Sequence, residues 1–438
     1  MREYSPEVEP DGRPDVIVCG AGPAGLCAAI AAGRSGAGVL LIERYGFVGG
    51  MSTAALVYPW MTFHDRTGER IVDGLPQEIV DRLRAVGGSP GHLRDTVGFV
   101  HSLTPFDPDH YRILADRMLA EAGCQVLYHA LLADVRAAGD RVIACCVQTP
   151  SRRLVFQART FVDATGDAAL CHLAGVPMQE DVTGAAVQPM TMCFRVGGVD
   201  LGAVDGYVRE NPSEFHEATL VGYQPLTGVS GFFTIWREAQ LPVPRDRLLF
   251  FAGTRPGQVY MNTSRILGRD GTDPVDLSEA EREGRRQADA ICRFLCERVP
   301  GFAESYLDRL PAQVGVRETR RVRGEFTLAA EHTSEGARFE DAVARSAYPM
   351  DMHSPAGSGM VFSRPPTAPY DIPYRCLVPV GVRNVLAAGR CISATHEAHA
   401  SARLTPTCMM MGESAGRAAA WAARTGRDVR EWEPGVLA

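Results

Sequence analysis

The sequence has no pair of cysteines spaced as C-x-x-C, although its 438 residues include 12 cysteines. That spacing is the usual sign of a redox dithiol or a zinc site, so neither is predicted. Free cysteines are often ordinary core residues, and disulfides are rare in reducing compartments. The cysteine pattern therefore favours buried thiols in a cytoplasmic protein without a metal site.

The sequence also has no apolar run of the ~20 residues that a membrane-spanning helix needs. Its formal net charge of −7 disfavours nucleic-acid and anionic-membrane partners, because both attract a basic face. Residues 1–14 are acidic and contain proline, so a loose leader is expected there and no secretory signal. These features favour a soluble globular protein of two or three lobes.

One glycine-rich motif stands out, in the stretch DVIVCGAGPAGLCAAI. Gly20, Gly22 and Gly25 have the G-x-G-x-x-G spacing, between a strand-like apolar run and a helix-like run of small residues. Such glycines allow a tight turn, close approach to a pyrophosphate and close packing of helix on strand. The next strand-like run, GVLLIER, ends in Glu43, where a carboxylate binds ribose hydroxyls and disfavours NADP. The motif predicts a dinucleotide site.

Three later segments extend this pattern. Directly after Glu43 comes the segment RYGFVGGMSTAALV. Another buried strand is expected within ARTFVDATGDAALCHLAGVP. A strand, a glycine turn, a loop and a helix follow one another in VRNVLAAGRCISATHEAHASARLTPTCMMMGESAGRAAAWAA. With these segments, residues 15 to about 424 resemble the FAD-dependent oxidoreductases with a glutathione-reductase-type flavin fold. The resemblance is closest to bacterial members distantly related to fumarate-reductase flavoproteins, through stretches such as VYMNTSRILGRDGTDP, GVRETRRVRGE, YPMDMHSP, YDIPYRCLVP and AAGRCISATHEAHAS.

The resemblance implies FAD as the cofactor and assigns residues to its parts. The glycine motif would meet the pyrophosphate, Glu43 the adenosine ribose, Gly389 the ribityl phosphate, and the helix opening at Pro406 and Thr407 the flavin. The full set of implied cofactor-binding residues is Gly20, Gly22, Gly25, Glu43, Arg44, Gly50, Met51, Ser52, Asp167, Gly389, Arg390 and Thr407. Many flavoproteins have Asp after the last glycine, where this chain has Arg390, so a ribityl-binding carboxylate is not identified.

The expected fold is α/β, with a Rossmann-like FAD-binding domain carrying a three-stranded β-meander and a mixed α+β substrate domain with an antiparallel sheet. The runs CQVLYHALLADVRA, DRVIACCVQT and RRLVFQARTFVDATG predict the meander. A long helix is expected after TDPVDLSEAE, capped by Asp276 or Ser278. The predicted divisions are the leader (residues 1–14), the first part of the FAD-binding domain (15–175), the substrate domain (176–370) and the C-terminal part of the FAD-binding domain (371–438).

No second strand–GxGxxG–helix unit is recognisable, and no dithiol follows the second predicted strand. Disulfide-reductase chemistry is therefore not predicted, and electrons are expected to pass through the site that also holds the substrate. Three segments offer groups for proton transfer or anion stabilisation. The candidates are Arg317 in VGVRETRRVRGE, His396 in CISATHEAHAS and His353 in YPMDMHSPAG. For each, a structural role remains the alternative: a salt-bridge network for the arginine, a packed or exposed side chain for the histidines.

The predicted function is hydride transfer between a small organic substrate and flavin N5. A flavin-dependent monooxygenase and a non-catalytic FAD-binding interaction protein are the alternatives. The sequence leaves open the substrate, the direction of the redox step, the electron acceptor, covalent attachment of FAD and the oligomeric state, including a homodimer.

Overall fold

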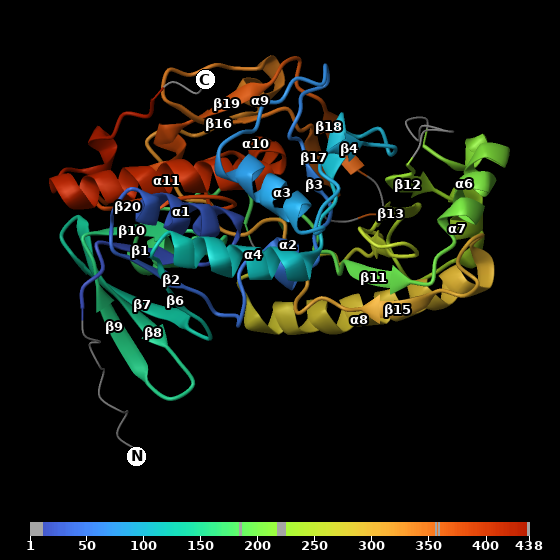
Figure 1. Ribbon diagram of the computed structural model, residues 1–438, viewed down its shortest axis with the longest axis horizontal. Coiled ribbons are helices and arrows are strands. Elements are labelled where there is room, and N and C mark those ends of the chain that lie inside the picture. The colour runs from blue at the N-terminus through green and yellow to red at the C-terminus, as the bar shows by residue number, and fades with distance from the viewer. Residues whose placement is uncertain (1–11, 184–185, 217–224, 355–356, 358–359, 436–438) are drawn as a thin grey trace.

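The computed structural model describes residues 12–183, 186–216, 225–354, 357 and 360–435 (Figure 1). Residues 1–11 of the expected leader lie outside the described residues. A five-stranded parallel sheet has the order β20-β10-β1-β2-β6. Its strands are Val385–Ala387, Thr160–Asp163, Val16–Cys19, Val39–Ile42 and Gln125–Leu127, in that order.

The two faces of the parallel sheet carry different layers. Val16 and Val18 of β1 belong to the core beneath α1 (Pro23–Arg34) and α11 (Thr405–Thr425), whereas Ile17 and Cys19 belong to the core on the other face. This alternation is the two-residue period of a strand buried on both faces. In Figure 1, α11 lies along α1 above the sheet, and β7, β8 and β9 form an antiparallel sheet below it. The helices α3 (Leu75–Ala85) and α4 (Pro108–Glu121) cover the same side as α1.

The strand-like runs expected to form the meander are divided differently in the structure. The small sheet consists of β7 (Leu131–Ala138), β8 (Arg141–Gln148) and β9 (Arg153–Gln157). The beginning of the first run is β6 and the end of the third run is β10, and both join the parallel sheet. His129, which separates β6 from β7, has φ 52°, a conformation that ends an extended strand.

The second large sheet is antiparallel, with the order β12-β13-β14-β11-β15. Its strands are Gly228–Gly231, Leu248–Ala252, Val259–Met261, Phe194–Gly197 and Tyr306–Arg309. The long helix α8 (Pro274–Arg298) packs on it, and α6 (Leu201–Glu210) and α7 (Phe233–Ala239) lie at its far end (Figure 1). The expected caps of α8 were wrong: the Asp273 side chain accepts from the backbone N–H groups of Val275 and Asp276, and Pro274 occupies the first turn.

Shorter elements connect the two sheets. β16 pairs with β19, β17 pairs with β18, and β3, β4 and β5 form a small sheet. The remaining bounds are α2 (Met51–Ala54), β3 (Trp60–Met61), β4 (Leu93–Arg94), β5 (Ser102–Thr104), α5 (Ala169–Leu173), α9 (Ala330–Glu335), β16 (Ala342–Ser346), β17 (Met350–His353), β18 (Met360–Arg364), β19 (Tyr370–Pro373) and α10 (His396–Ala402), with short 3₁₀ turns at Pro212–Glu214, Tyr374–Leu377 and Val429–Glu431.

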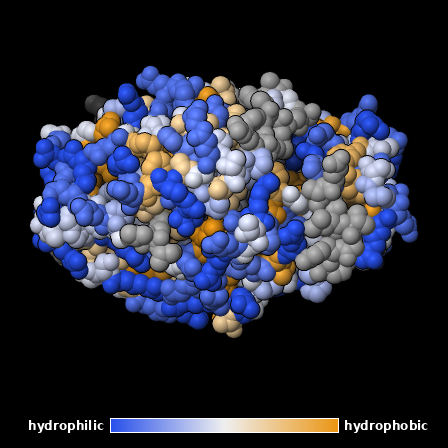
Figure 2. Space-filling view, turned by 90° about the horizontal axis from the view of Figure 1, so that it is seen from above, coloured by the Kyte–Doolittle hydropathy of each residue, from blue (hydrophilic) through white to orange (hydrophobic). Residues whose placement is uncertain are grey.

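The expected α/β class, with one parallel sheet and a separate antiparallel sheet, is confirmed. The divisions at residues 175/176 and 370/371 stay a prediction. Figure 2 shows hydrophilic side chains over most of one face, with hydrophobic ones scattered among them. Among the helices that the structure describes, none has both the length and the hydropathy for crossing a bilayer.

Candidate functional site

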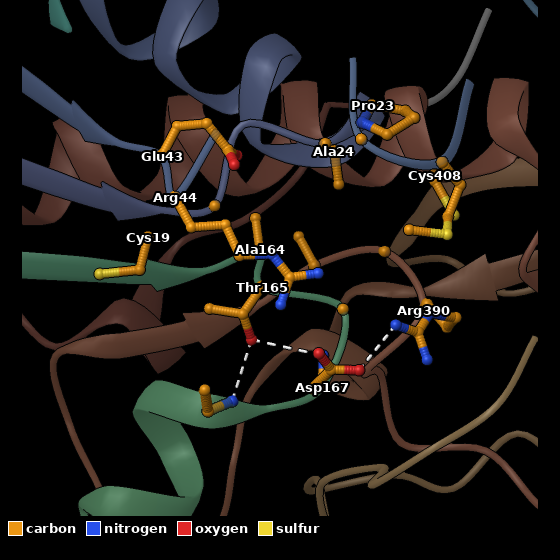
Figure 3. Close-up of a pocket in the computed structure, with 18 of the residues that line it drawn as sticks. Cys19, Pro23, Ala24, Glu43, Arg44, Ala164, Thr165, Asp167, Arg390 and Cys408 are labelled. Atoms are coloured by element: carbon orange, nitrogen blue, oxygen red, sulfur yellow. Dashed lines mark hydrogen bonds and ion pairs between the residues drawn. The ribbon is translucent and has the colours of Figure 1, made fainter. Parts of the chain in front are cut away.

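A pocket opens at the carboxyl ends of the parallel strands, where β1, β2, β10 and β20 meet the helices α1 and α11 (Figure 3). About 1070 Å³ of space inside and at the mouth of this pocket is not occupied by protein atoms, and part of that space is open to solvent. In open α/β sheets, ligands bind in the crevice at this end of the strands. The backbone of the glycine motif, Glu43 and the turns after β10 and β20 line the pocket.

The three glycines of the motif are required for three different reasons. Gly20 has φ +91°, which strains any other residue, and a Cβ there would lie 2.6 Å from the carbonyl oxygen of Ala164. A Cβ on Gly25 would lie 1.8 Å from the carbonyl oxygen of Gly20. A Cβ on Gly22 would meet no protein atom closer than 3.9 Å, and Gly22 lines the pocket. The protein itself leaves room for a side chain at Gly22, so the close approach that glycine permits there is available to a ligand.

Glu43 is buried at the rim of the pocket and fixed by the backbone. One carboxylate oxygen accepts from the N–H of Ala21 at 2.7 Å, and the other accepts from the N–H of Tyr45 at 2.9 Å. Burial raises the pKa of Glu43, and the two backbone hydrogen bonds oppose that rise. Each carboxylate oxygen retains a lone pair after these bonds, so Glu43 can still accept from hydroxyl groups of a ligand.

The N-termini of two helices, α1 and α11, face the pocket, and no side chain caps either of them. The N-cap of α1 is Gly22, the N-cap of α11 is Leu404, and neither supplies a capping side chain. Thr405 in the first turn of α11 lines the pocket, and the buried hydroxyl of Thr407 has no hydrogen-bond partner among the described residues. Free N–H groups and a positive helix end are the features that bind phosphate and other anionic groups.

A carboxylate from another part of the chain, Asp167, lies beside Arg390. Asp167, in the turn after β10, accepts from Arg390 at 2.7 Å and from the Thr319 hydroxyl at 2.9 Å, and both Asp167 and Arg390 line the pocket (Figure 3). Burial alone would raise the pKa of Asp167, but the charges of Arg390 and Arg44 lower it. An ionised carboxylate and a guanidinium therefore stand side by side on the pocket wall.

Most of the predicted cofactor-binding residues line this pocket. They are Gly20, Gly22, Glu43, Arg44, Gly50, Met51, Asp167, Gly389 and Arg390. Gly25, Ser52 and Thr407 are not in its wall. The Ser52 hydroxyl accepts from the indole N–H of Trp60 at 3.0 Å, so it points into the core. Gly25 is needed for the close contact of its backbone with the carbonyl oxygen of Gly20.

The predicted catalytic histidine His396 begins α10 and is oriented by a buried carboxylate. Its Nδ1 lies 2.9 Å from Glu318, and its Nε2 has no hydrogen-bond partner among the described residues. Burial alone would raise the pKa of Glu318, but the hydrogen bond from His396 and the charges of His399 and Arg321 lower it to about 2. An ionised Glu318 accepts the proton of Nδ1 and leaves the lone pair of Nε2 available.

His399 lies one turn further along α10 and is buried. Its Nε2 donates to the carbonyl oxygen of Arg390 at 2.8 Å, and its Nδ1 lies 3.8 Å from Glu318. Burial lowers the pKa of His399 to about 3, so the ring is neutral near pH 7. The ring therefore braces the Arg390 turn of the pocket.

Arg317 and His353, the other predicted catalytic residues, lie close to each other and outside the pocket wall. Arg317 donates to the carbonyl oxygen of Pro189 at 2.7 Å and to the hydroxyl of Thr191 at 2.6 Å. His353 accepts at Nδ1 from Arg265 at 2.9 Å, and its Nε2 lies 3.3 Å from Asp351. Burial lowers the pKa of His353 to about 4, and both ring nitrogens are engaged by the protein.

The sequence prediction missed Arg403, which lines the pocket directly before α11. Its position ahead of the helix that starts at Thr405 was a usable signal, because a cation beside a helix N-terminus opposes the helix dipole and needs a reason to be there. Arg245, Arg265 and Asp351 were missed as well, and no local pattern marks them.

The glycine turn, the buried carboxylate of Glu43 and the two helix N-termini without a side-chain cap are features typical of a dinucleotide site. The sequence matches the family model described as "FAD dependent oxidoreductase" over residues 15–436, and the chain belongs to that family. Its cofactor is FAD. The pocket geometry fits this cofactor, because Gly22 allows a ligand to approach its backbone closely and no side chain caps the two helix N-termini that face the pocket.

Solved structures with a similar course of the chain are distant in sequence. One is a geranylgeranyl bacteriochlorophyll reductase-like protein from Thermoplasma acidophilum, with 12% identity, TM-score 0.49 and coverage of 94% of this chain and 78% of that one. Another is p-nitrophenol 4-monooxygenase from Pseudomonas putida, with 12% identity, TM-score 0.46 and coverage of 96% and 81%. A third is L-proline dehydrogenase from P. horikoshii, with 10% identity, TM-score 0.45 and coverage of 95% and 94%. A search of curated protein sequences gave no match.

Proposed function

We propose that this FAD-dependent oxidoreductase transfers a hydride between a small organic substrate and N5 of the flavin, as a dehydrogenase or oxidase does. When bound, FAD supplies the electron-accepting ring, and the protein supplies orientation, electrostatics and proton transfer. The observation that carries the proposal is His396, which an ionised Glu318 holds through Nδ1 and whose Nε2 has no partner among the described residues, at the end of the loop that follows Arg390 of the pocket wall.

His396 would take the proton that leaves the substrate together with the hydride. Its Nε2 is the unengaged nitrogen, and Glu318 both fixes the ring and stabilises the cation that forms on protonation. The backbone N–H of His396 donates to Asp181 at 2.8 Å, and Asp181 also accepts from Arg321 at 2.7 Å, so the start of α10 is held in place. A base that is held by a second group is a common arrangement in enzymes that use general-base catalysis.

The proposed cofactor contacts follow the pocket wall. The backbone at Gly20 and Gly22 and the start of α1 would hold the diphosphate, and Glu43 would accept from the adenosine ribose. Gly50 and Met51 would border the ribityl chain, while Asp167 and Arg390 would position it from the opposite wall.

The test is anaerobic reduction of the purified holoenzyme by a panel of small metabolites, followed at the visible bands of the flavin near ~450 nm. For any compound that bleaches the flavin, His396→Gln is expected to slow reduction by about 10²- to 10⁴-fold. FAD content should be unchanged in this variant, because His396 is not part of the pocket wall.

A different outcome would favour the monooxygenase alternative. In that case no metabolite would reduce the flavin directly, NADPH would reduce it faster in the presence of a substrate, and oxygen consumption would accompany formation of a hydroxylated product. A flavin that neither metabolites nor pyridine nucleotides reduce would support the non-catalytic alternative.

A further inference from the structure

Four arginines from separate parts of the chain converge beside the flavin pocket. Arg245 precedes β13, Arg265 follows β14, Arg317 follows β15 and Arg403 ends α10. The charge of Arg317 lowers the pKa of each of the other three arginines, and the charge of Arg265 also lowers the pKa of Arg245. We refer to Arg245, Arg265, Arg317 and Arg403 as the arginine cluster.

The carboxylates whose charges act on the cluster lie at a distance from most of its members. They are Asp246, Asp351 and Glu318; Asp351 lies 3.3 Å from His353, and Glu318 lies 2.9 Å from His396. Among the described residues, no carboxylate lies within 4.0 Å of Arg245, Arg317 or Arg403. A buried cation normally has a charged partner, because burial without one costs several kcal/mol.

Several polar atoms of the cluster and its surroundings are buried and have no hydrogen-bond partner in the part of the chain that the structure describes. They are Nε of Arg245, Nε of Arg403 and Nε2 of Gln188. Gln188 is 2% exposed, and its side-chain oxygen accepts from Arg403 at 3.3 Å. Buried donors of this kind are rare in native proteins, and a bound ligand or ion is a usual explanation. All three unpartnered atoms are N–H donors, so what they lack is an acceptor.

The electrostatics agree with this geometry. Burial and the charges of Arg265 and Arg317 lower the pKa of Arg245 to about 9. Burial and the charge of Arg317 lower the pKa of Arg403 to about 10. Guanidinium groups remain protonated at these values near pH 7, so the cluster retains an excess of positive charge in a region with little water.

The cluster is continuous with the flavin pocket through Arg403. Arg403 lines the pocket near Thr405, which lies in the first turn of α11. The charges of Arg317 and Asp351 both influence the pKa of Arg403. A ligand bound by the cluster would therefore lie next to the part of the pocket that α11 faces.

We infer that the arginine cluster binds an oxyanion group of the substrate, a carboxylate or a phosphate, and so holds an anionic organic molecule against the flavin. This inference rests on the proposed function for the presence of a substrate in the pocket. Guanidinium groups bind both types of oxyanion through paired N–H donors, which the free Nε atoms of Arg245 and Arg403 can supply. His353, which pairs with Asp351, would hold the Arg265 side chain in position.

The test measures binding to the FAD-loaded protein and does not need the true substrate. The probes are succinate and benzoate as carboxylates, glycerol 3-phosphate as a phosphate, and succinamide as an uncharged analogue of succinate. Binding is followed by the change in the flavin absorption spectrum and by the shift in melting temperature. We expect saturable binding of carboxylate or phosphate probes, at least about tenfold tighter than succinamide.

The variants Arg245→Gln and Arg403→Gln each remove one guanidinium whose Nε has no acceptor among the described residues, and each should weaken the binding of the preferred probe by at least about tenfold. Arg237→Gln is the matched control, because Arg237 is exposed on α7 and its side chain bonds only to Thr234 among the described residues. If a Gln variant does not fold, Arg245→Lys retains the charge but loses the paired donors, and it should still weaken binding.

The results separate this inference from the proposed function. A preference for the carboxylates identifies an organic acid as the ligand class, and a preference for glycerol 3-phosphate identifies a phosphorylated compound. Equal binding of succinate and succinamide, or equal affinities in wild type and the two Gln variants, would overturn the inference even if a neutral metabolite reduces the flavin. Oxyanion binding without reduction by any metabolite would instead contradict the proposed hydride transfer.

Discussion

At the scale of single residues, Gly22 and Gly25 differ in what a methyl group would touch. At Gly25 it would overlap the carbonyl oxygen of Gly20, whereas at Gly22 it would enter the pocket. Gly22 also has φ −67° and ψ −176°, a conformation that any residue adopts. The same substitution at the two positions should therefore separate binding from folding.

Gly22→Ala should leave the stability of the FAD-free protein within about 0.5 kcal/mol of wild type and weaken FAD binding roughly tenfold or more, since overpacking costs about 1–3 kcal/mol. Gly25→Ala should lower the free energy of unfolding by about 2 kcal/mol or more, because backbone must move to relieve the overlap. Flavin titration and chemical denaturation of both FAD-free variants measure these effects. Equal loss of stability in the two variants would contradict the prediction.

At the scale of elements, α1 and α11 pack closely through small residues. A Cβ on Gly412 would lie 2.0 Å from the carbonyl oxygen of Ala24, and one on Gly416 would lie 2.1 Å from that of Ala28. Gly412 and Gly416 are one turn apart, so they form a flat stripe along α11 against which the backbone of α1 rests. This contact places the N-termini of both helices at the same pocket.

Gly416→Ala should lower the free energy of unfolding by about 2 kcal/mol, although alanine favours a helix over glycine by up to ~1 kcal/mol, because the overlap with α1 costs more. Gly206→Ala in α6 is the control, since a Cβ there meets nothing within 4 Å, and it should raise stability by roughly 0.5–1 kcal/mol. Denaturant unfolding of both variants is the measurement. A stabilised Gly416→Ala variant would show that the helices can separate without cost.

The glycine turn was predictable because its residues are contiguous, and their conformational requirements can be inferred from the sequence alone. The partition of strands was not, because β6 and β7 form one apolar run that only the positive φ of His129 divides. The cap of α8 was misplaced at Asp276 or Ser278 although Asp273 directly precedes a proline, the more informative local signal. The Asp167–Arg390 pair and the arginine cluster join residues far apart in the chain, and only the folded structure brings them together.

At the scale of the whole molecule, buried neutral histidines make stability depend on pH. His353 and His399 have pKa values lowered to about 4 and 3 by burial, against about 6.5 in an unfolded chain. Between the pKa of the unfolded chain and that of the folded protein, these histidines bind protons only in the unfolded chain. Stability is therefore lost as pH falls below about 6.5. Glu318, with its pKa lowered to about 2, adds a further loss below about pH 4.5.

The free energy of unfolding should therefore fall between pH 7 and pH 5, with a limiting slope of about 1.4 kcal/mol per pH unit for each histidine. Urea denaturation of the FAD-free protein across this range measures the slope. His399→Gln removes one of the groups whose pKa the fold lowers, so its profile should be flatter than that of wild type. Identical slopes in the two proteins would contradict the assignment of His399 as a buried neutral ring.

The flavin pocket is assembled from distant parts of the chain: its wall includes Gly20 near one end and Thr405 and Cys408 near the other. During synthesis, the glycine turn leaves the ribosome long before the residues that complete the opposite wall. Cofactor capture must therefore wait until translation has passed residue 408, and until then the apolar surface of α1 has no α11 to cover it. Chains stalled or truncated before that point should be targets for chaperones and proteases, whatever the supply of FAD in the cell.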